Sequence, residues 1–279
     1  MTMEAVGTSC PSCGAPFTGK YCSACGEKKV SAHDFTAGHF IEESIEGFTH
    51  FDNKFLRTLK LLLFRPGMLT THFAEGRKVP YMKPMQLFIV SNLLFFLLVG
   101  AGNVFAHRIG NYLVERGGIF NTRSAFYSKF GAAADVTRLG QVFNEKMAGQ
   151  SKAFIFLFIP FYALACALLF LRRRKPFGLH LTFAAHFFSF LLLYFTLFHF
   201  LFVLPDRYLF HMSQEAFERL AIYLNLFVLI GYFTLAARRF YRSGWIFSFF
   251  SGIAAGVLFI ILLQAYRLFL FHNILRTLH

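Results

Sequence analysis

Acidic residues are scarce in this sequence, and so is charge of either sign. The 279 residues include 14 Asp and Glu against 28 Lys and Arg, and charged residues make up 15% of the chain. A soluble domain carries about 25% charged residues. Five long apolar segments hold no carboxylate at all. This argues against a pump or a zinc transporter that moves its ion along intramembrane carboxylates.

Sequence motifs of several enzyme classes are also missing. The chain has no Walker loop, no nucleotide-binding glycine fingerprint, no GxSxG and no HExxH. Nothing in it therefore supports a kinase or a hydrolase, and we expect a protein that is not an enzyme. The N-terminus lacks the basic segment and apolar run of a cleavable signal peptide.

Hydrophobic residues, by contrast, make up 56% of the chain and include 41 Phe. They are concentrated in five segments, each long enough to cross a membrane as a helix of about 20 residues. The predicted fold class is an all-α polytopic membrane protein, with its transmembrane bundle in residues 85–279. The five predicted spans are 85–106, 153–171, 181–204, 220–237 and 245–271.

The basic residues predict how these spans are oriented. The connections after the second and fourth spans are rich in Arg and Lys, whereas the connection after the third carries two cations and three acids. The positive-inside rule then predicts a cytoplasmic N-terminus and an external C-terminus. Residues 107–152 become an external loop, although they hold seven cations against three acids, and 135–147 within them is a predicted amphipathic helix. The cations of the two cytoplasmic connections are Arg172, Arg173, Arg174, Lys175, Arg238, Arg239 and Arg242.

The net charge of +14 would suggest nucleic acid as a partner if the protein were soluble. Here the cations lie next to apolar spans, so membrane lipids are the expected partner and nucleic acid is not.

Four cysteines near the N-terminus form two CxxC pairs in the segment CPSCGAPFTGKYCSACG. Two matched pairs this close predict a zinc ribbon in residues 1–30, over a redox CxxC or a chance cluster. Four sulfur ligands leave no open position, so the Zn2+ is expected to be structural. Free thiolates also favour a reducing, cytoplasmic compartment. The ligands are Cys10, Cys13, Cys22 and Cys25, whereas Cys166 lies in an apolar segment.

Residues 31–84 are predicted to be an interfacial helical region that ends in a basic collar. Apolar residues at helical spacing predict a helix over 34–64, and its last part, KFLRTLKLLLF, mixes cations with apolar residues. That part fits the membrane interface or packing on the protein's own spans, and the sequence leaves both open. The Arg65-Pro66-Gly67 triplet ends the helix. Candidate headgroup or ligand contacts are Arg65, Arg77, Lys78, Tyr81 and Lys83.

Three further side chains are candidate functional residues within the membrane. His186 and His199 are 13 residues apart in the third span, which places them within about 60° on one helix face. Haem ligation would need a matching pair on a second helix, and no other span has one. Arg267 either extends its guanidinium to the interface or forms an anion site. The small-residue segment SGIAAG at 251–256 fits close helix packing or a homo-oligomer contact.

The segments FLRTLKLLLFRPG and EGRKVPYMKPMQLFIVSNLLFF, after a CxxC–CxxC ribbon, resemble bacterial membrane proteins grouped as domain of unknown function 3667. The likeness covers about residues 10–97, and the Arg77-Lys78 order is the reverse of the Lys-Arg expected in the family. The resemblance implies that residues 54–84 form the family signature and that the protein lies in the bacterial cytoplasmic (inner) membrane. It implies no activity. The positions that carry it are Thr58-Leu59, Arg65-Pro66-Gly67, Gly76-Arg77-Lys78, Tyr81 and Pro84.

Three functions remain open at this point. The leading hypothesis is a non-enzymatic membrane protein that handles or senses a lipid or small solute, with the ribbon as a structural module or a dock for a cytoplasmic protein. The second is an oligomeric channel or transporter with Phe-lined gates. The third is a membrane enzyme acting on lipid-linked substrates, and the residues nominated for its active site are His72, Glu75, Arg77, Lys78 and Tyr81.

Overall fold

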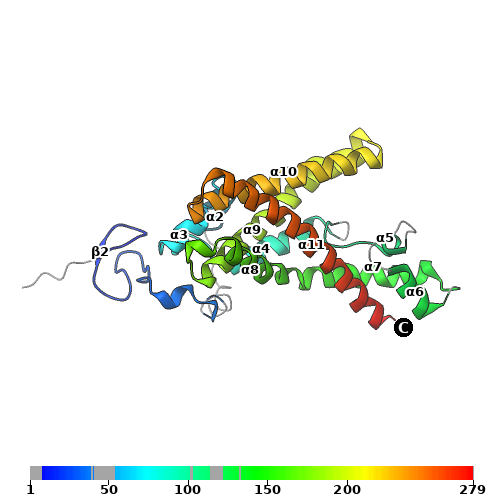
Figure 1. Ribbon diagram of the computed structural model, residues 1–279, viewed down its shortest axis with the longest axis horizontal. Helices are drawn as coiled ribbons and strands as arrows, with labels where there is room; N and C mark the ends of the chain where they lie inside the picture. Colours follow the sequence, from blue (N-terminus) through cyan, green and yellow to red (C-terminus); the bar gives the residue numbers. More distant parts are fainter. Residues whose placement is uncertain are drawn as a thin grey trace, which may run out of the picture. The chain divides into compact units, whose positions relative to one another are not determined.

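The computed structural model of the chain describes residues 8–38, 40, 54–100, 103–113, 122–131 and 133–278. These fall into two compact units. The first is formed by Met1–Asn92 and Phe158–Gly256, and the second by Leu93–Leu157 and Val257–His279. The described part is mainly helical, with a small two-stranded sheet near the N-terminus (Figure 1).

The N-terminal part of the first unit contains the only sheet among the described residues. Strands β1 (Thr8–Ser9) and β2 (Pro16–Phe17) pair antiparallel, and a single bridge joins Tyr21 to Lys28. A short 3-10 helix, η1 (Ala32–Phe35), follows. The helix predicted over 34–64 is present from Lys54 onward, and its residues 41–53 lie outside the described part of the chain.

The next three helices are α2 (Lys54–Phe64), α3 (Met68–Ala74) and α4 (Pro84–Leu98). As predicted, α2 ends just before the Arg65-Pro66-Gly67 triplet, where Gly67 takes a φ of 76°. Helix α4 has 15 residues. At 1.5 Å per residue it is about 22 Å long, which is short of the roughly 30 Å of a membrane's hydrocarbon core.

Long apolar helices make up most of the remaining chain. They are α8 (Phe158–Leu169), α9 (Phe177–Phe198), α10 (Gln214–Tyr241) and α11 (Trp245–Thr277), and two π-helical segments, η4 (His199–Val203) and η5 (Asp206–Phe210), continue α9. Short 3-10 segments, η2 (Ile155–Leu157) and η3 (Leu171–Arg173), flank α8.

Three of these helical stretches are long and apolar enough to cross a membrane: 177–210, α10 and α11. A fourth is formed if α7 (Val136–Ala153) and the segment Ile155–Leu169 count as one span, because they are bent by 42° at a short break. The described residues thus form three or four candidate spans where the sequence predicted five. The difference arises at the predicted 85–106 span, because α4 already ends at Leu98 and Gly100 turns the chain with a φ of 69°.

The core of the first unit is built from aromatic rings, which accounts for much of the phenylalanine. Helix α9 is buried along most of its length, and its Phe183 and Phe187 meet Phe233 of α10 edge-on at 5.5 and 5.3 Å between ring centroids. Tyr162 of α8 stacks on Phe187 and donates its hydroxyl hydrogen to the Ala255 carbonyl of α11. Offset and edge-on ring pairs of this kind add stability beyond the area that they bury.

The small-residue segment 251–256 packs α11 against α10 of the same chain. A Cβ added at Gly252 would overlap the Thr234 hydroxyl, and one at Gly256 would lie 3.2 Å from Ile230. Of the two roles open for SGIAAG, close helix packing is the one that these contacts show.

The second unit contains α5 (Ile109–Leu113), α6 (Thr122–Phe130) and α7. Asp135 caps α7 by accepting hydrogen bonds from the Thr137 and Arg138 backbone N–H groups, so the helix predicted at 135–147 is confirmed and runs six residues further. Lys129 and Lys146 donate to the carbonyls of Leu275 and Thr277 at the end of α11. Lysines at these positions satisfy carbonyls that have no partner inside the helix.

Candidate metal centre and the segment that holds it

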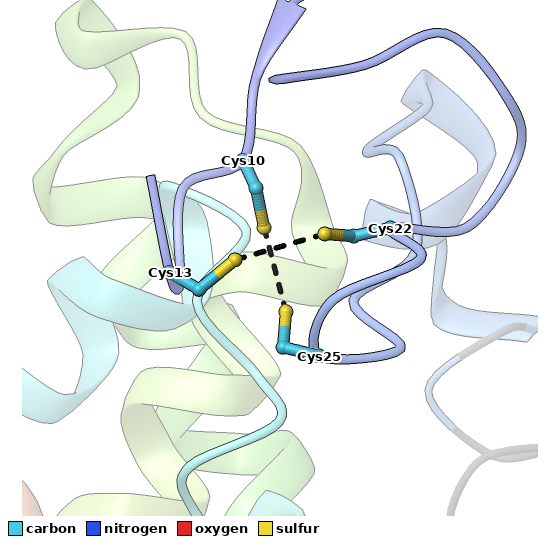
Figure 2. Close-up of side chains that lie close together, drawn as sticks. All are labelled: Cys10, Cys13, Cys22 and Cys25. Carbon is cyan, nitrogen blue, oxygen red and sulfur yellow. Dashed lines mark hydrogen bonds between the residues drawn. The ribbon is translucent and has the colours of Figure 1, made fainter. Parts of the chain in front are cut away.

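The four ribbon cysteines point their sulfur atoms at one common point, as Figure 2 shows. The Sγ atoms all lie within 4.8 Å of one another, and the Cys10–Cys25 and Cys13–Cys22 pairs are each 3.6 Å apart. Four sulfurs arranged tetrahedrally at about 2.3 Å from a zinc ion would be about 3.8 Å apart. The separation is also far longer than the ~2.05 Å of a disulfide, so the four are free thiols. The donor set and its spacing therefore fit a tetrahedral zinc site.

Each CxxC pair sits in a turn of the same form. The Gly14 N–H donates to the Cys10 carbonyl at 2.9 Å, and the Gly26 N–H donates to the Cys22 carbonyl at 2.8 Å. The two glycines have φ values of 79° and 75°. Residues with a Cβ rarely adopt this left-handed conformation, so the glycine after each pair lets the turn close around its two thiols.

The neighbouring thiols act on one another, so that the pKa of Cys10 falls while that of Cys25, despite a hydrogen bond from the Glu27 backbone, rises to about 12 through burial and hydrogen bonds with the other three thiols. Although desolvation raises its pKa, hydrogen bonds from the Cys13 and Ser12 backbone, together with those among the thiols, lower the pKa of Cys10 to about 7. Thiolate is the form that binds metal. Cys10 and Cys22 are buried around Phe17, whereas Cys13 is exposed. With all four donors contributed by the chain, the centre has no position left for a substrate.

A single buried carboxylate joins this ribbon to the basic collar, which is the connection 75–83 between α3 and α4. Glu27, which directly follows the second CxxCG, is 2% exposed. Its Oε2 accepts hydrogen bonds from the backbone N–H groups of Lys78 and Val79, both at 2.9 Å, and from the Ser12 hydroxyl. A carboxylate buried without such donors would be strongly disfavoured, so the ribbon and the collar stabilise this charge together.

Close backbone approach reinforces this contact. Gly76 has a φ of 85°, and a Cβ there would overlap the Val30 side chain. Gly178, at the start of α9, lies so close to η1 that a Cβ would overlap the Phe35 carbonyl oxygen. The ribbon and η1 are therefore packed on the collar and on the beginning of α9.

An ion pair holds η1 in place. Lys28 Nζ lies 2.7 Å from Asp34 Oδ1, and the Ser31 N–H donates to the other carboxylate oxygen at 2.8 Å. Although burial opposes it, these bonds lower the pKa of Asp34 to about 2.

The segment 54–84, which follows the ribbon, is in turn anchored on α10. The Tyr232 hydroxyl donates to the Leu62 carbonyl at 2.8 Å, and Arg239 Nη1 donates to the Pro66 carbonyl at 2.7 Å. A Cβ at Gly67 would overlap the Ala236 carbonyl oxygen. The turn that ends α2 thus packs directly against the last part of α10. The Pro66 carbonyl accepts the hydrogen bond from Arg239, and the absence of a side chain at Gly67 allows the close approach to Ala236.

Hydrogen bonds inside the segment fix its own path. Thr58 Oγ1 donates to the Lys54 carbonyl at 2.6 Å and accepts from the Met82 N–H at 3.0 Å. His72 Nδ1 and the Tyr81 hydroxyl are 2.9 Å apart, and their rings stack at 5.4 Å. Burial and the charge of Arg77 lower the pKa of His72, with Glu75 acting in the opposite direction.

The candidate headgroup contacts lie in different surroundings. Arg65 and Arg77 are exposed, and Lys83 is half-buried. Lys78 is half-buried with its Nζ 5.9 Å from the Phe35 ring centroid, and Tyr81 is held by His72. The five residues thus form no single cluster among the described contacts, and their role in binding headgroups stays a prediction.

The candidate residues within the membrane are also separated. His186 is buried in α9, with Nδ1 2.9 Å from the Thr70 hydroxyl of α3 and the Phe73 ring edge-on. His199 lies in η4 against Phe200. No contact among the described residues joins the two histidines.

Arg267 belongs to the second unit. Its Nη2 donates to the Val104 carbonyl at 2.6 Å, and its own carbonyl accepts from the Tyr112 hydroxyl at 3.1 Å. The guanidinium is thus held by backbone within this unit.

Sequence reasoning missed the residues that join the elements. Glu27 lies among lysines in a small ribbon, where a carboxylate is normally on the surface. Only its position directly after the second CxxCG could have drawn attention to it. His180, whose Nδ1 lies 2.8 Å from the Tyr241 hydroxyl, and Thr70 were missed for a similar reason, because their partners are far away in sequence.

The family comparison matches this anchored segment and not the ribbon. Residues 52–96 match the model of a family described as a protein of unknown function, DUF3667. This segment is similar to that family. The DUF3667 match contains α2, α3, the collar and most of α4, so the predicted signature at 54–84 is confirmed, while the likeness expected from residue 10 starts only at residue 52. No curated protein and no solved structure matches the chain.

The structure gives the DUF3667 signature a physical meaning. Gly67 meets Ala236, Gly76 meets Val30, and Thr58 holds the Met82 N–H. Gly67 therefore lets the segment pack on α10 and Gly76 lets it pack on the ribbon, whereas Thr58 holds the segment's own path.

Proposed function

We propose that the protein is a non-enzymatic integral membrane protein in which a zinc-loaded ribbon fixes the DUF3667 segment against the membrane helices. The buried Glu27 carboxylate, shared between ribbon and collar, carries this proposal. A ribbon that served only to capture another protein would not need to bury its own charge in the rest of the chain. The helical part then handles or senses a lipid or a small solute.

The proposed ion is Zn2+, held by Cys10, Cys13, Cys22 and Cys25. When bound, it supplies folding energy to a ribbon whose strands are only two residues long. The closed sulfur shell supports a structural role over a catalytic one.

We place the ribbon on the cytoplasmic side of a bacterial inner membrane. Two independent sequence arguments require the ribbon and the Arg-rich connections to share one side, and contacts within the first unit support this. Phe35 meets Gly178 just after the 172–175 connection, and Pro66 meets Arg239 in the 238–242 connection. The ribbon end and the basic end of these helices are thus the same end.

Lipid contact is supported by the side chains that α10 and α11 expose. Large apolar residues along both helices have no covering protein among the described residues, as expected for surfaces that face hydrocarbon. The most exposed of them are Tyr223, Phe227, Ile246, Phe250 and Ile261.

A substitution that keeps the ribbon but removes its carboxylate tests the proposal. In the Glu27→Gln variant, one amide oxygen remains but the charge is lost, so the collar should be released while the four thiols still hold zinc. We expect unchanged zinc content together with faster proteolytic cleavage after Arg77 and Lys78. The matched control is Glu75→Gln, which removes an exposed carboxylate of the same collar.

One outcome of this experiment would contradict the proposal. Equal cleavage rates in Glu27→Gln, Glu75→Gln and the unchanged protein would overturn the structural role of the ribbon. Orientation is tested separately in intact cells: a membrane-impermeant thiol reagent should reach a cysteine introduced at the exposed ribbon residue Lys20, in the Lys20→Cys variant, only after the inner membrane is opened.

A further inference from the structure

We propose that the connections 172–175 and 238–242, called here the basic pair, form one binding site for the phosphate of anionic phospholipid headgroups. The inference rests on the lipid part of the proposed function and gives it a ligand class and a place in the fold. Its observations come from the first unit alone and involve neither the ribbon nor its metal.

Aromatic contacts hold the two connections side by side. Phe170, at the end of α8, stacks on Tyr241 of α10 with ring centroids 3.8 Å apart. Lys175 Nζ lies 4.4 Å from the centroid of the Phe240 ring. Residues 172–175, which follow α8, are therefore held beside residues 238–242 at the end of α10.

Among the described residues, no carboxylate forms an ion pair with a cation of the basic pair. The two connections carry seven cations, and the sequence has no Asp or Glu in 153–205 or after Glu218. Within the described residues, the only carboxylate ion pair is the one between Lys28 and Asp34. Burial and the nearby charge of Arg242 both lower the pKa of Lys175, which shows that these two cations repel each other. A bound anion would remove that repulsion.

Some of these cations are already engaged, which narrows the site. Arg239 donates to the Pro66 carbonyl, and the Arg238 guanidinium lies 4.0 Å from the Trp245 ring centroid. Lys175 also lies over a ring, that of Phe240, but its ammonium is close enough to Arg242 for the two charges to interact, so these two residues form the centre of the site, with Arg172, Arg173 and Arg174 around it.

The backbone supports this arrangement. Arg174 and Arg242 both have left-handed conformations, with φ values of 47° and 51°. Glycine adopts this conformation without strain, whereas other residues do so at a cost in free energy. Within each of the two connections an arginine thus ends a helical segment at a position where glycine would be easier to accommodate.

The surroundings favour a lipid phosphate over a soluble one. Trp245 is 57% exposed beside Arg238, and exposed apolar side chains follow on the next turn of α11. Exposed Leu168, Leu171 and Phe177 flank the 172–175 connection in the same way. Cations and a Trp at the border of apolar helices are typical of the level at which headgroups lie.

The test compares lipid retention by the full chain with that of matched variants. The protein is purified in detergent, offered phosphatidylglycerol or phosphatidylcholine, and the bound lipid is counted by native mass spectrometry. The unchanged protein should retain phosphatidylglycerol preferentially. The Lys175→Gln/Arg242→Gln variant should bind it roughly 30-fold more weakly, since each cation near an anionic headgroup contributes about fivefold.

Two further variants separate this site from general charge and from folding. Arg207→Gln/Arg219→Gln removes the same charge from η5 and from the first part of α10, and should leave retention unchanged. Lys175→Arg keeps the charge and should also retain the lipid, whereas a merely structural role of the lysine would make it fail.

Each alternative has its own signature. Equal phosphatidylglycerol retention by the Lys175→Gln/Arg242→Gln variant, or an equal loss in the Arg207→Gln/Arg219→Gln control, would overturn the site. Displacement of the lipid by inorganic phosphate would reassign it to a soluble anion, and tighter capture of single-stranded RNA would reassign it to nucleic acid. If the site fails while Glu27→Gln still releases the collar, the ribbon's role survives without it.

Discussion

The ribbon and the aromatic core of the helices are stabilised in opposite ways, although both lie in the first unit. The ribbon depends on a few atoms: four sulfurs around one point, and one carboxylate oxygen that accepts from two backbone N–H groups. The core depends on many contacts that overlap. Phe187 alone meets the rings of Tyr162, Phe188, Tyr232 and Phe233.

This difference predicts how each region fails. Removing one directional contact from the ribbon leaves its partners unsatisfied, because no neighbour can replace a thiolate or a carboxylate. Removing one ring from the core leaves the other ring contacts in place. We therefore expect all-or-none loss in the ribbon and graded loss in the helices.

The largest effect should come from removing half of the metal centre. In the Cys22→Ser/Cys25→Ser variant two thiolates remain, which is too few to hold zinc tightly, and a ribbon of this size does not fold without its ion. We expect complete loss of bound zinc by elemental analysis and rapid proteolysis within residues 8–30. Far-ultraviolet circular dichroism should still show the helices.

The buried fifth cysteine provides the control for that experiment. Cys166 lies in α8, far along the chain from the ribbon, so Cys166→Ala should keep its zinc. Loss of helical signal together with zinc in the double variant would show that the two regions unfold as one, and the contrast drawn above would not hold.

A large but partial effect is expected in the aromatic core. Phe233 is fully buried, and Phe233→Ala removes ring contacts to Tyr162, Phe183 and Phe187. Burial losses of this kind cost about 3–5 kcal/mol of unfolding free energy. Denaturant titration in detergent should show this loss with zinc content unchanged, and the exposed Phe227→Ala should have little effect. Zinc release by Phe233→Ala would contradict the independence of the two regions.

A smaller effect is expected where the DUF3667 segment meets α10. Gly67→Ala introduces a side chain at a positive φ and against the Ala236 carbonyl. Gly131→Ala is the matched control, because its φ of 79° is similar and no atom lies within 4 Å of the added Cβ. Both should lose about 1 kcal/mol to the left-handed backbone, and Gly67→Ala should lose a further 1–3 kcal/mol to overlap. Equal shifts in the thermal midpoint would mean that the close approach to Ala236 is not important.

Local sequence features correctly predicted that the four cysteines come together, because the CxxC turns are local. The two CxxC pairs are each within four residues, and their sulfurs do converge. The Arg65-Pro66-Gly67 break and the helix around 135–147 were also predicted, since a proline, a left-handed glycine and an Asp cap act on their immediate neighbours.

Contacts between distant segments were not predictable in this way. Nothing near Glu27 in the sequence indicates that its partners are the N–H groups of residues 78 and 79. The span count was overestimated for a related reason. Hydropathy over 85–106 is continuous, whereas the helix ends at Leu98 because of a backbone turn at Gly100, which a sum over apolar residues cannot detect.

The smallest predicted effect is a pH dependence that arises at the contact between His72 of α3 and Tyr81. Burial and Arg77 lower the pKa of His72 in the folded protein, so its neutral form is favoured there. As pH falls below about 6.5, the unfolded chain takes up a proton that the folded chain does not, and stability decreases until the pH reaches the folded pKa. His72→Gln keeps a polar partner for Tyr81 but cannot titrate. Its thermal midpoint should therefore fall less steeply with acidification than that of the unchanged protein, over the range in which both retain zinc. Parallel curves would remove His72 as the source of the pH dependence and leave the thiolates of the ribbon, which bind protons in competition with zinc, as the remaining pH-sensitive element of this region.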